Sequence, residues 1–191
     1  MKFPAAIFFL FLWPQTGRLP FMDVVIGIDP GATSGWAVLT VEGNPNLLLG
    51  DSITWPKAGT KKDLSANTPS SVVKSLVESM RQFGHTVVGA AIEDQFLKLN
   101  VNTMKKIARN SGRWEEACRS QDIPVVWVNP ATWQAKELGS SRIDSAEVKR
   151  RCARKVVGIW NQRLKQDAAD AAIIGRYHAI RLAFVRLRGG K

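Results

Sequence analysis

Residues 22–31 read Met-Asp-Val-Val-Ile-Gly-Ile-Asp-Pro-Gly, an apolar run that ends at Asp29 in front of a Pro-Gly turn signal. A short apolar run bounded by turn residues is typical of a buried β-strand. The segments 34–41 and 47–55 have the same character, and a Gly-Asn-Pro turn at 43–45 separates them. Three consecutive strands joined by tight turns predict an antiparallel meander at the start of the fold.

The rest of the chain alternates between helical and strand patterns. Apolar residues at helical spacing begin near Pro69, and the polar stretch 57–70 before them is expected to be a mobile loop. Later segments are expected as strands over 86–93 and 124–128, and as helices over 103–120, from Pro130, over 145–157 and over 167–187. This order predicts an α/β fold: a mixed five-stranded sheet, its first three strands antiparallel, with helices on both faces.

The chain is strongly basic. Its 191 residues include 27 Lys and Arg against 16 Asp and Glu, which gives a formal net charge of +11. Such an excess favours a polyanionic partner, with nucleic acid ahead of an anionic membrane surface. Most of the basic residues fall in three blocks, 98–113, 136–165 and 176–191, of which the first and third contain no acid. These blocks are expected to hold phosphates, the alternative being ordinary solvated helix faces.

The cysteines and two of the tryptophans are expected to serve packing. Cys118 and Cys152 are the only cysteines and form no C-x-x-C pair, so a disulfide framework and a zinc site are not expected and a reducing compartment is favoured. Trp114 and Trp133 lie beside basic residues, where an aromatic side chain can stack on bases. We expect both to pack in the core instead.

The first 21 residues differ from the rest. Lys2 is followed by the apolar run 3–13 and then by a Pro-containing break, as in a signal peptide. The run is shorter than the about 20 residues that a membrane-spanning helix needs. The alternative, which we favour, is that Met22 is the true start and that the upstream stretch is misassigned. We therefore expect an extension over 1–21, one domain over 22–191, a cytoplasmic location and no membrane partner.

Four acids occupy positions that suggest a metal site. Asp29 ends the first strand, Glu93 ends the fourth, and Asp167 and Asp170 lie three apart on one face of the last helix. If the first and fourth strands are neighbours, all four carboxylates meet at one sheet edge, which is costly unless cations lie between them. Oxygen ligands suit Mg²⁺ or Mn²⁺. Two such ions about 4 Å apart activate water and stabilise the leaving oxygen in phosphodiester cleavage.

Each acid also has an ordinary structural explanation. Asp167 can cap or complement the start of a helix, and Asp29 before Pro-Gly can form a turn. Glu93 and Asp94 can be solvated loop charges. These explanations weaken only when the four acids are considered together.

Three short motifs, taken in order, resemble the RuvC family of Holliday junction resolvases. They are Ile-Gly-Ile-Asp-Pro-Gly at 26–31, Ile-Glu at 92–93 followed by Phe96, and Asp-Ala-Ala-Asp-Ala at 167–171. The segment 130–157, with Ser-Ala-Glu at 145–147, is also similar to that family. The resemblance covers about residues 22–180, and the small phage-encoded members are the most similar in character.

The resemblance implies an RNase H-like fold, a homodimer and paired nicks across four-way DNA junctions. It implies two Mg²⁺ ions in each active site, with Mn²⁺ as a substitute. Asp29, Glu93, Asp167 and Asp170 match the family's catalytic, metal-binding acids. Phe96 matches an aromatic residue that acts on bases near the junction centre, the alternative being that it packs on the next helix. Together with the basic blocks, the expected DNA contacts are Phe96, Lys98, Lys105, Lys106, Arg109, Lys136, Lys149 and Arg150.

Three other functions remain open at this point. A related nuclease acting on flaps, forks or other branched DNA fits the same acids. A catalytically inactive DNA-binding relative fits the charge. The segment 27–35 also resembles the first phosphate loop of actin-like ATPases and sugar kinases, but these proteins close two copies of the fold around a nucleotide, and a domain over 22–191 supplies only one.

Overall fold

The sheet is mixed, and its first three strands are antiparallel. The structure is a computed structural model that describes residues 21–31, 33–54, 68–94 and 101–189. The spatial order of its strands is β3-β2-β1-β4-β5, with β1 over Asp23–Asp29, β2 over Thr33–Thr40, β3 over Leu47–Thr54, β4 over Thr86–Glu93 and β5 over Val125–Val128. Strands β1 to β3 pair antiparallel, whereas β4 is parallel to β1 and β5 is parallel to β4. The predicted meander and fold class are confirmed.

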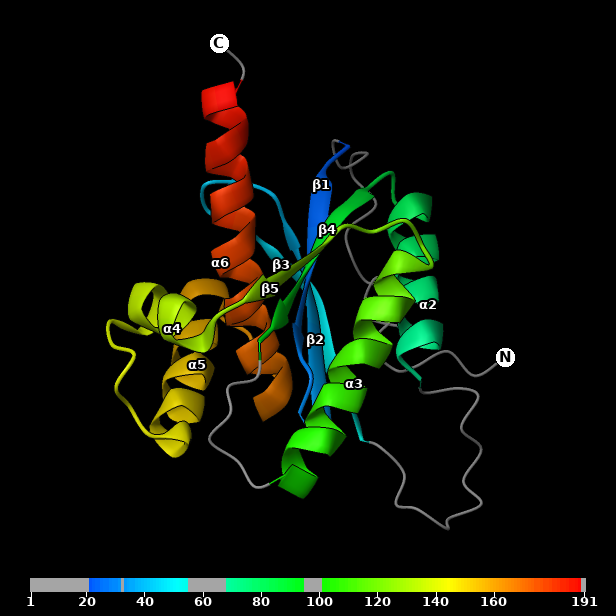
Figure 1. Ribbon diagram of the computed structural model, residues 1–191. Coiled ribbons are helices and arrows are strands. Elements are labelled where there is room, and N and C mark those ends of the chain that lie inside the picture. Colours follow the sequence, from blue (N-terminus) through cyan, green and yellow to red (C-terminus); the bar gives the residue numbers. More distant parts are fainter. Residues whose placement is uncertain (1–20, 32, 55–67, 95–100, 190–191) are drawn as a thin grey trace.

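Helices cover both faces of this sheet (Figure 1). Helices α2 (Pro69–Gln82) and α3 (Val101–Arg119) pack on one face, on the right in Figure 1. Helices α4 (Pro130–Leu138), α5 (Ser145–Trp160) and α6 (Gln166–Gly189) pack on the other. Of these, α6 lies directly on β1 and β2. Among the helices described, none is both long and apolar enough to cross a membrane.

Three helices begin at caps that the sequence already displays. The side chains of Thr68, Asn129 and Asp144 each accept a hydrogen bond from a backbone N–H two or three residues further on. A proline follows the first two of these caps, at a position where the helix needs no N–H. The loop predicted over 57–70 therefore extends two residues into the helix, because α2 begins at Pro69, directly after its cap Thr68. Positions 55–67 lie outside the described residues.

The core contains both tryptophans that were expected to pack. The side chains of Trp114 and Trp133 are 0% and 1% exposed, on opposite faces of the sheet. Cys118 and Cys152 are also fully buried and unpaired. The packing prediction is confirmed for the tryptophans.

Candidate active site

The carboxyl ends of β1 and β4 bring two of the predicted acids to one edge of the sheet. The two strands are parallel neighbours with Ile28 opposite Ile92, so Asp29 and Glu93, the next residue of each strand, leave the sheet side by side. On α6, Asp167 and Asp170 face the same edge, and their carboxylate oxygens lie within 4.8 Å of each other and of an oxygen of Asp29. The predicted meeting of β1, β4 and the last helix is therefore present.

The close approach of α6 depends on two glycines. A Cβ atom at Gly35 of β2 would lie 1.8 Å from the carbonyl oxygen of Asp167, and one at Gly27 of β1 would lie 2.1 Å from that of Ala171. No side chain fits at either position, so the helix backbone lies against the sheet backbone. This contact places the first turn of α6 beside the end of β1, where Asp29 lies.

The four acids line one cleft of about 480 Å³, together with residues of the loop after β1 and of helices α4 and α5. Glu93 is not part of the 4.8 Å group of the three aspartates, and its Oε1 accepts a hydrogen bond from the indole N–H of Trp133 at 2.8 Å. The other residues of the lining are Gly31, Thr33, Gln134, Ser145, Val148 and Lys149.

The carboxylates repel one another, as the pKa of Asp29 shows. Burial raises the pKa of Asp29 well above its usual value, and the charges of Glu93, Asp170 and Asp167 raise it further. An aspartate used as a plain turn former would not be placed among three other acids. The arrangement therefore favours a proton or a cation between these groups at neutral pH.

Asp170 is the most deeply buried of the four, with 6% of its surface exposed. Burial raises the pKa of this carboxyl to about 6, although a hydrogen bond from the Cys152 thiol and the charge of Lys149 act in the opposite direction. Gln166 also donates its side-chain N–H to Asp170 Oδ1, at 3.2 Å. Two donors, the thiol of Cys152 on α5 and the side-chain amide of Gln166 on α6, thus hold one carboxylate.

Lys149 is the cation nearest to this cluster among the cleft-lining residues. Its Nζ lies 3.1 Å from Asp167 Oδ1. Burial alone would lower the pKa of Lys149, but the hydrogen bond to Asp167 and the charges of Asp170 and Asp29 raise it. Asp167 lies inside the first turn of α6, after Gln166, so it is not the cap residue of that helix.

Sequence reasoning missed the roles of Trp133, Gln134 and Cys152. Trp133 was expected only to pack, yet its N–H binds Glu93. Cys152 was treated as an ordinary structural residue, yet its thiol binds Asp170. Gln134 lines the cleft, whereas the predicted contact Lys136 is exposed on α4 and does not belong to the lining described. The helical positions of these residues relative to the acids follow from packing, for which the sequence carries no local signal.

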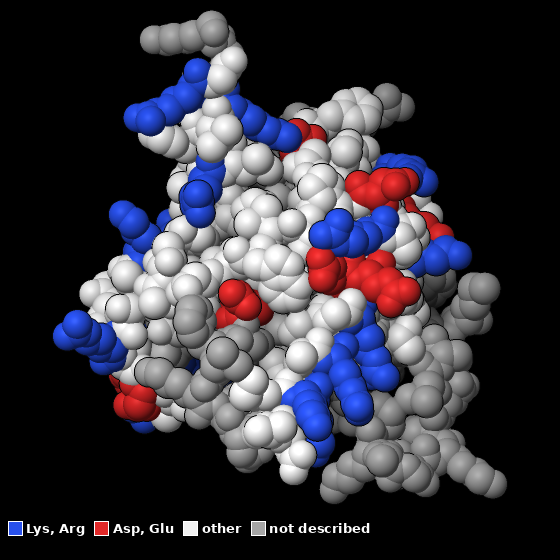
Figure 2. Space-filling view, viewed as in Figure 1, with Lys and Arg blue, Asp and Glu red and all other residues white. Residues whose placement is uncertain are grey.

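The predicted DNA contacts on α3 form an exposed basic row. Lys105, Lys106 and Arg109 are all exposed, and Figure 2 shows Lys and Arg side chains gathered over the N-terminal half of this helix. Asn110, which directly follows Arg109, is buried, and its Nδ2 donates a hydrogen bond to the carbonyl oxygen of Gly31 at 3.1 Å. The basic helix is therefore tied to the turn that follows β1. Phe96 and Lys98, just before α3, lie outside the described residues, so their predicted roles stay predictions.

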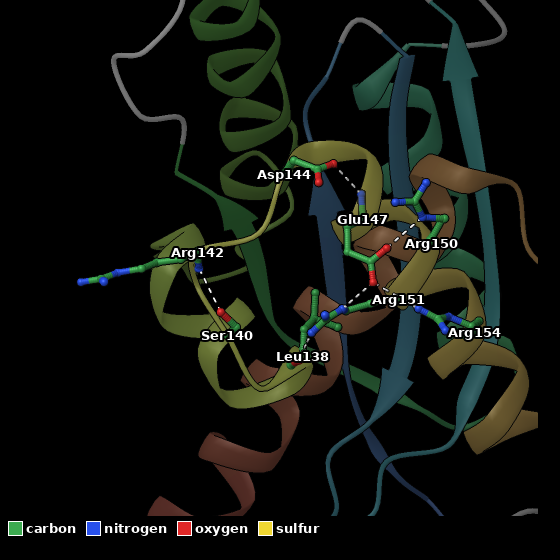
Figure 3. A network of polar contacts seen from close by, with 8 residues as sticks. All are labelled: Leu138, Ser140, Arg142, Asp144, Glu147, Arg150, Arg151 and Arg154. Carbon is green, nitrogen blue, oxygen red and sulfur yellow. Dashed lines mark hydrogen bonds and ion pairs between the residues drawn. The ribbon is translucent and has the colours of Figure 1, made fainter.

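On α5, the carboxylate of Glu147 binds three arginines (Figure 3). Its carboxylate accepts hydrogen bonds from Arg151 and Arg150 at 2.8 Å and from Arg154 at 3.2 Å. The bonds from Arg151 and Arg150 lower the pKa of Glu147 to about 2. Arg151 also donates to the carbonyl oxygen of Leu138, which joins α5 to the end of α4. Arg150, a predicted DNA contact, is thus held in place with its side chain 66% exposed.

The raised pKa values of Asp29 and Asp170 predict how metal ions stabilise the fold at different pH. A raised carboxyl pKa stabilises the metal-free protein at low pH, and this stabilisation is lost as pH rises through the folded value, about 6 for Asp170. A divalent cation must displace the proton, so its apparent affinity falls about tenfold per pH unit below that value. We expect 10 mM Mg²⁺ to raise the melting temperature, relative to EDTA, clearly at pH 8 and little at pH 5.

Thermal unfolding in paired Mg²⁺ and EDTA samples measures this difference, because other titrating groups affect both samples equally. Asp170→Asn is the control: it removes the titrating group and should show a small Mg²⁺ effect at both pH values. An equal Mg²⁺ effect at pH 5 and pH 8 in the unmodified protein would contradict the prediction.

The family model and the curated relatives that match this sequence agree on one family. The sequence model of the family described as crossover junction endodeoxyribonuclease RuvC matches residues 25–178. A protein of that name from Nitratidesulfovibrio vulgaris is 28% identical over 169 residues, which cover 86% of this chain and 95% of the relative. One from Bifidobacterium adolescentis is 28% identical over 170 residues, which cover 88% of this chain and 84% of the relative.

The solved structures agree in fold. The Thermus thermophilus RuvC structure described as a complex with a Holliday junction substrate matches with a TM-score of 0.64 and 22% identity, over 86% of this chain and 96% of that one. A further Thermus thermophilus RuvC structure matches with a TM-score of 0.61 and 21% identity, over the same shares of the two chains. Both support the RNase H-like arrangement of the sheet and helices.

Proposed function

This chain belongs to the RuvC family of crossover junction endodeoxyribonucleases, and from that premise we propose that it resolves four-way DNA junctions by paired nicks. The observation that carries the proposal is the convergence of Asp29, Asp167 and Asp170 within 4.8 Å in a cleft that Glu93 also lines. A basic helix, α3, is hydrogen-bonded to the turn that leads out of this cleft. The site can therefore cut a phosphodiester while the surface beside it binds phosphates.

The family depends on divalent metal ions, and the residues of the cleft fit that requirement. Carboxylate oxygens are the ligands that Mg²⁺ and Mn²⁺ prefer, and burial raises the pKa values of Asp29 and Asp170, so a cation bound between these groups would be favoured. In our proposal the four acids hold two Mg²⁺ ions, for which Mn²⁺ can substitute. When bound, such ions supply an activated water and charge stabilisation for the leaving oxygen.

Paired nicks on a symmetric junction require two active sites, so the working unit in our proposal is a homodimer. Each protomer would cut one of two strands of like polarity. In this proposal its place of action is the cytoplasm. Sedimentation of the protein alone and with a junction tests the dimer directly.

The proposal is tested by cleavage of defined substrates. Mobile and immobile four-way junctions, a replication fork, a flap and a linear duplex are incubated with the protein in Mg²⁺ or EDTA. We expect nicks only in Mg²⁺, paired across the junction, with the duplex uncut. Faster cleavage of the fork or flap would support the related branched-DNA nuclease instead. Junction binding without cleavage in either Mg²⁺ or Mn²⁺ would support an inactive relative.

Junction affinity is expected to fall steeply with salt, because lysines and arginines release counterions from the phosphates that they contact. The slope of log affinity against log salt is about −0.9 per phosphate neutralised. Arg109→Ala should make the measured slope shallower by about one phosphate contact. Fluorescence anisotropy in EDTA measures this slope without cleavage.

The control is Arg81→Ala, which removes an exposed arginine near the end of α2, just before β4 begins and therefore at the other edge of the sheet. Its slope should match that of the unmodified protein. An unchanged slope in Arg109→Ala would remove α3 from the DNA-binding surface.

A further inference from the structure

Trp133 contacts the proposed metal ligand Glu93, and the fold fixes the orientation of the Trp133 side chain. The side chain is 1% exposed, and its Nε1 donates to Glu93 Oε1 at 2.8 Å. The residue lies in the first turn of α4, four positions after Asn129, whose side chain caps that helix. A buried indole held in this way presents its N–H in one direction only.

The strand that carries Glu93 is anchored to the same region. The backbone N–H of Asp94 donates to the carbonyl oxygen of Val128 at 2.9 Å, so the ends of β4 and β5 are joined where α4 begins. Glu93 and Trp133 therefore belong to one rigid corner, formed by the last residues of two strands and the first turn of a helix. Their hydrogen bond spans 40 positions of the chain.

A second buried tryptophan shows that burial alone does not produce such a bond. Trp114, on the other face of the sheet, is 0% exposed, and its Nε1 has no hydrogen-bond partner among the described residues. Both residues fill core space with the same side chain. They differ in that only the Trp133 indole N–H points to a carboxylate in the cleft.

We propose that Trp133 is a positioning residue that orients the Glu93 carboxylate for divalent metal binding. This inference rests on the proposed function, in which Glu93 is a metal ligand. Glu93 faces three other carboxylates and adds to the repulsion that raises the pKa of Asp29. Without a fixed donor, its carboxylate would turn away from the cluster whenever no cation is bound. The hydrogen bond from the indole N–H holds Oε1 of Glu93 in place and keeps the carboxylate at the wall of the cleft.

Donors that orient metal ligands in this way are worth about 10- to 100-fold in metal affinity or activity. We therefore expect Trp133→Phe to weaken Mn²⁺ binding about 10-fold or more in the absence of DNA. Cleavage should then need a correspondingly higher Mg²⁺ concentration, while the rate at saturating Mg²⁺ falls less. A role limited to packing would lower thermal stability without moving the metal concentration for half-maximal activity.

The experiment compares Trp133→Phe with Trp114→Phe, which removes the same volume from the core but no hydrogen bond. Mn²⁺ binding is measured by calorimetry on the protein alone, and thermal unfolding reports stability. Trp114→Phe should lose stability and keep its Mn²⁺ affinity. If Trp133→Phe folds poorly, 3-benzothienylalanine at position 133 replaces the N–H by sulfur at nearly constant shape.

A double-mutant cycle with Glu93→Gln tests whether the effect runs through the carboxylate. In the Glu93→Gln background, Trp133→Phe should cause no further loss of Mn²⁺ affinity. An equal loss in both backgrounds, or equal Mn²⁺ affinities in Trp133→Phe and Trp114→Phe, would overturn the inference. If the unmodified protein itself neither binds Mn²⁺ nor nicks a junction, the proposed function fails, which is a distinguishable result.

Discussion

Asp29→Asn and Asp170→Asn proteins are expected to bind a four-way junction but to leave it uncut. Each substitution keeps the shape of the side chain and removes one carboxylate from the group whose oxygens lie within 4.8 Å of one another. A neutral amide is a poor ligand for a doubly charged cation, so the metal site loses most of its affinity. Nicking should fall below detection at Mg²⁺ concentrations that saturate the unmodified protein.

Binding should be unchanged or tighter, because the loss of a negative charge reduces repulsion between the cleft and the phosphates. Electrophoretic mobility shift in EDTA measures binding, and nicking of the same labelled junction measures activity. The matched control is Asp94→Asn, which neutralises an exposed carboxylate directly after Glu93. That variant should cleave normally. Retained cleavage in Asp29→Asn or Asp170→Asn would contradict the site assignment.

Glu137→Ala is expected to cost about 3–5 kcal/mol of unfolding free energy, the usual effect of removing one partner from a buried ion pair. Glu137 is on α4, and its side chain is 6% exposed. Its carboxylate binds Lys155 of α5 at 2.7 Å and also binds Arg176 of α6. One anion therefore joins the three helices on this face of the sheet. Without it, two partly buried cations face each other with no compensating charge.

The matched control is Glu147→Ala, which also removes a glutamate bound to several basic residues. Its partners Arg150 and Arg154 are largely exposed, so solvent can replace the lost interactions. Denaturant unfolding of both variants measures the difference, and Glu137→Ala should be much the less stable. If the two variants lose similar stability, the buried triad does not hold α4, α5 and α6 together.

Much of the fold was predictable because its signals are local. The run at 22–31 shows both a buried strand and its end, since apolar residues stop at Asp29 and Pro-Gly follows. The caps Asn129 and Asp144 mark the starts of α4 and α5, because a side-chain oxygen there satisfies a backbone N–H nearby in sequence. The four acids were also found locally, from their places at strand ends and on one helix turn.

Other features are invisible in the sequence because they depend on contacts between distant segments. Nothing near Trp133 indicates that its N–H meets Glu93, and nothing near Gly35 indicates that the backbone of Asp167 lies against it. The sequence alone determined the strands, the helix starts and the identity of the acids, because these follow from the character of neighbouring residues. Only the tertiary structure decided which donors hold the acids and how closely α6 approaches the sheet, because packing brings together residues that no local pattern relates.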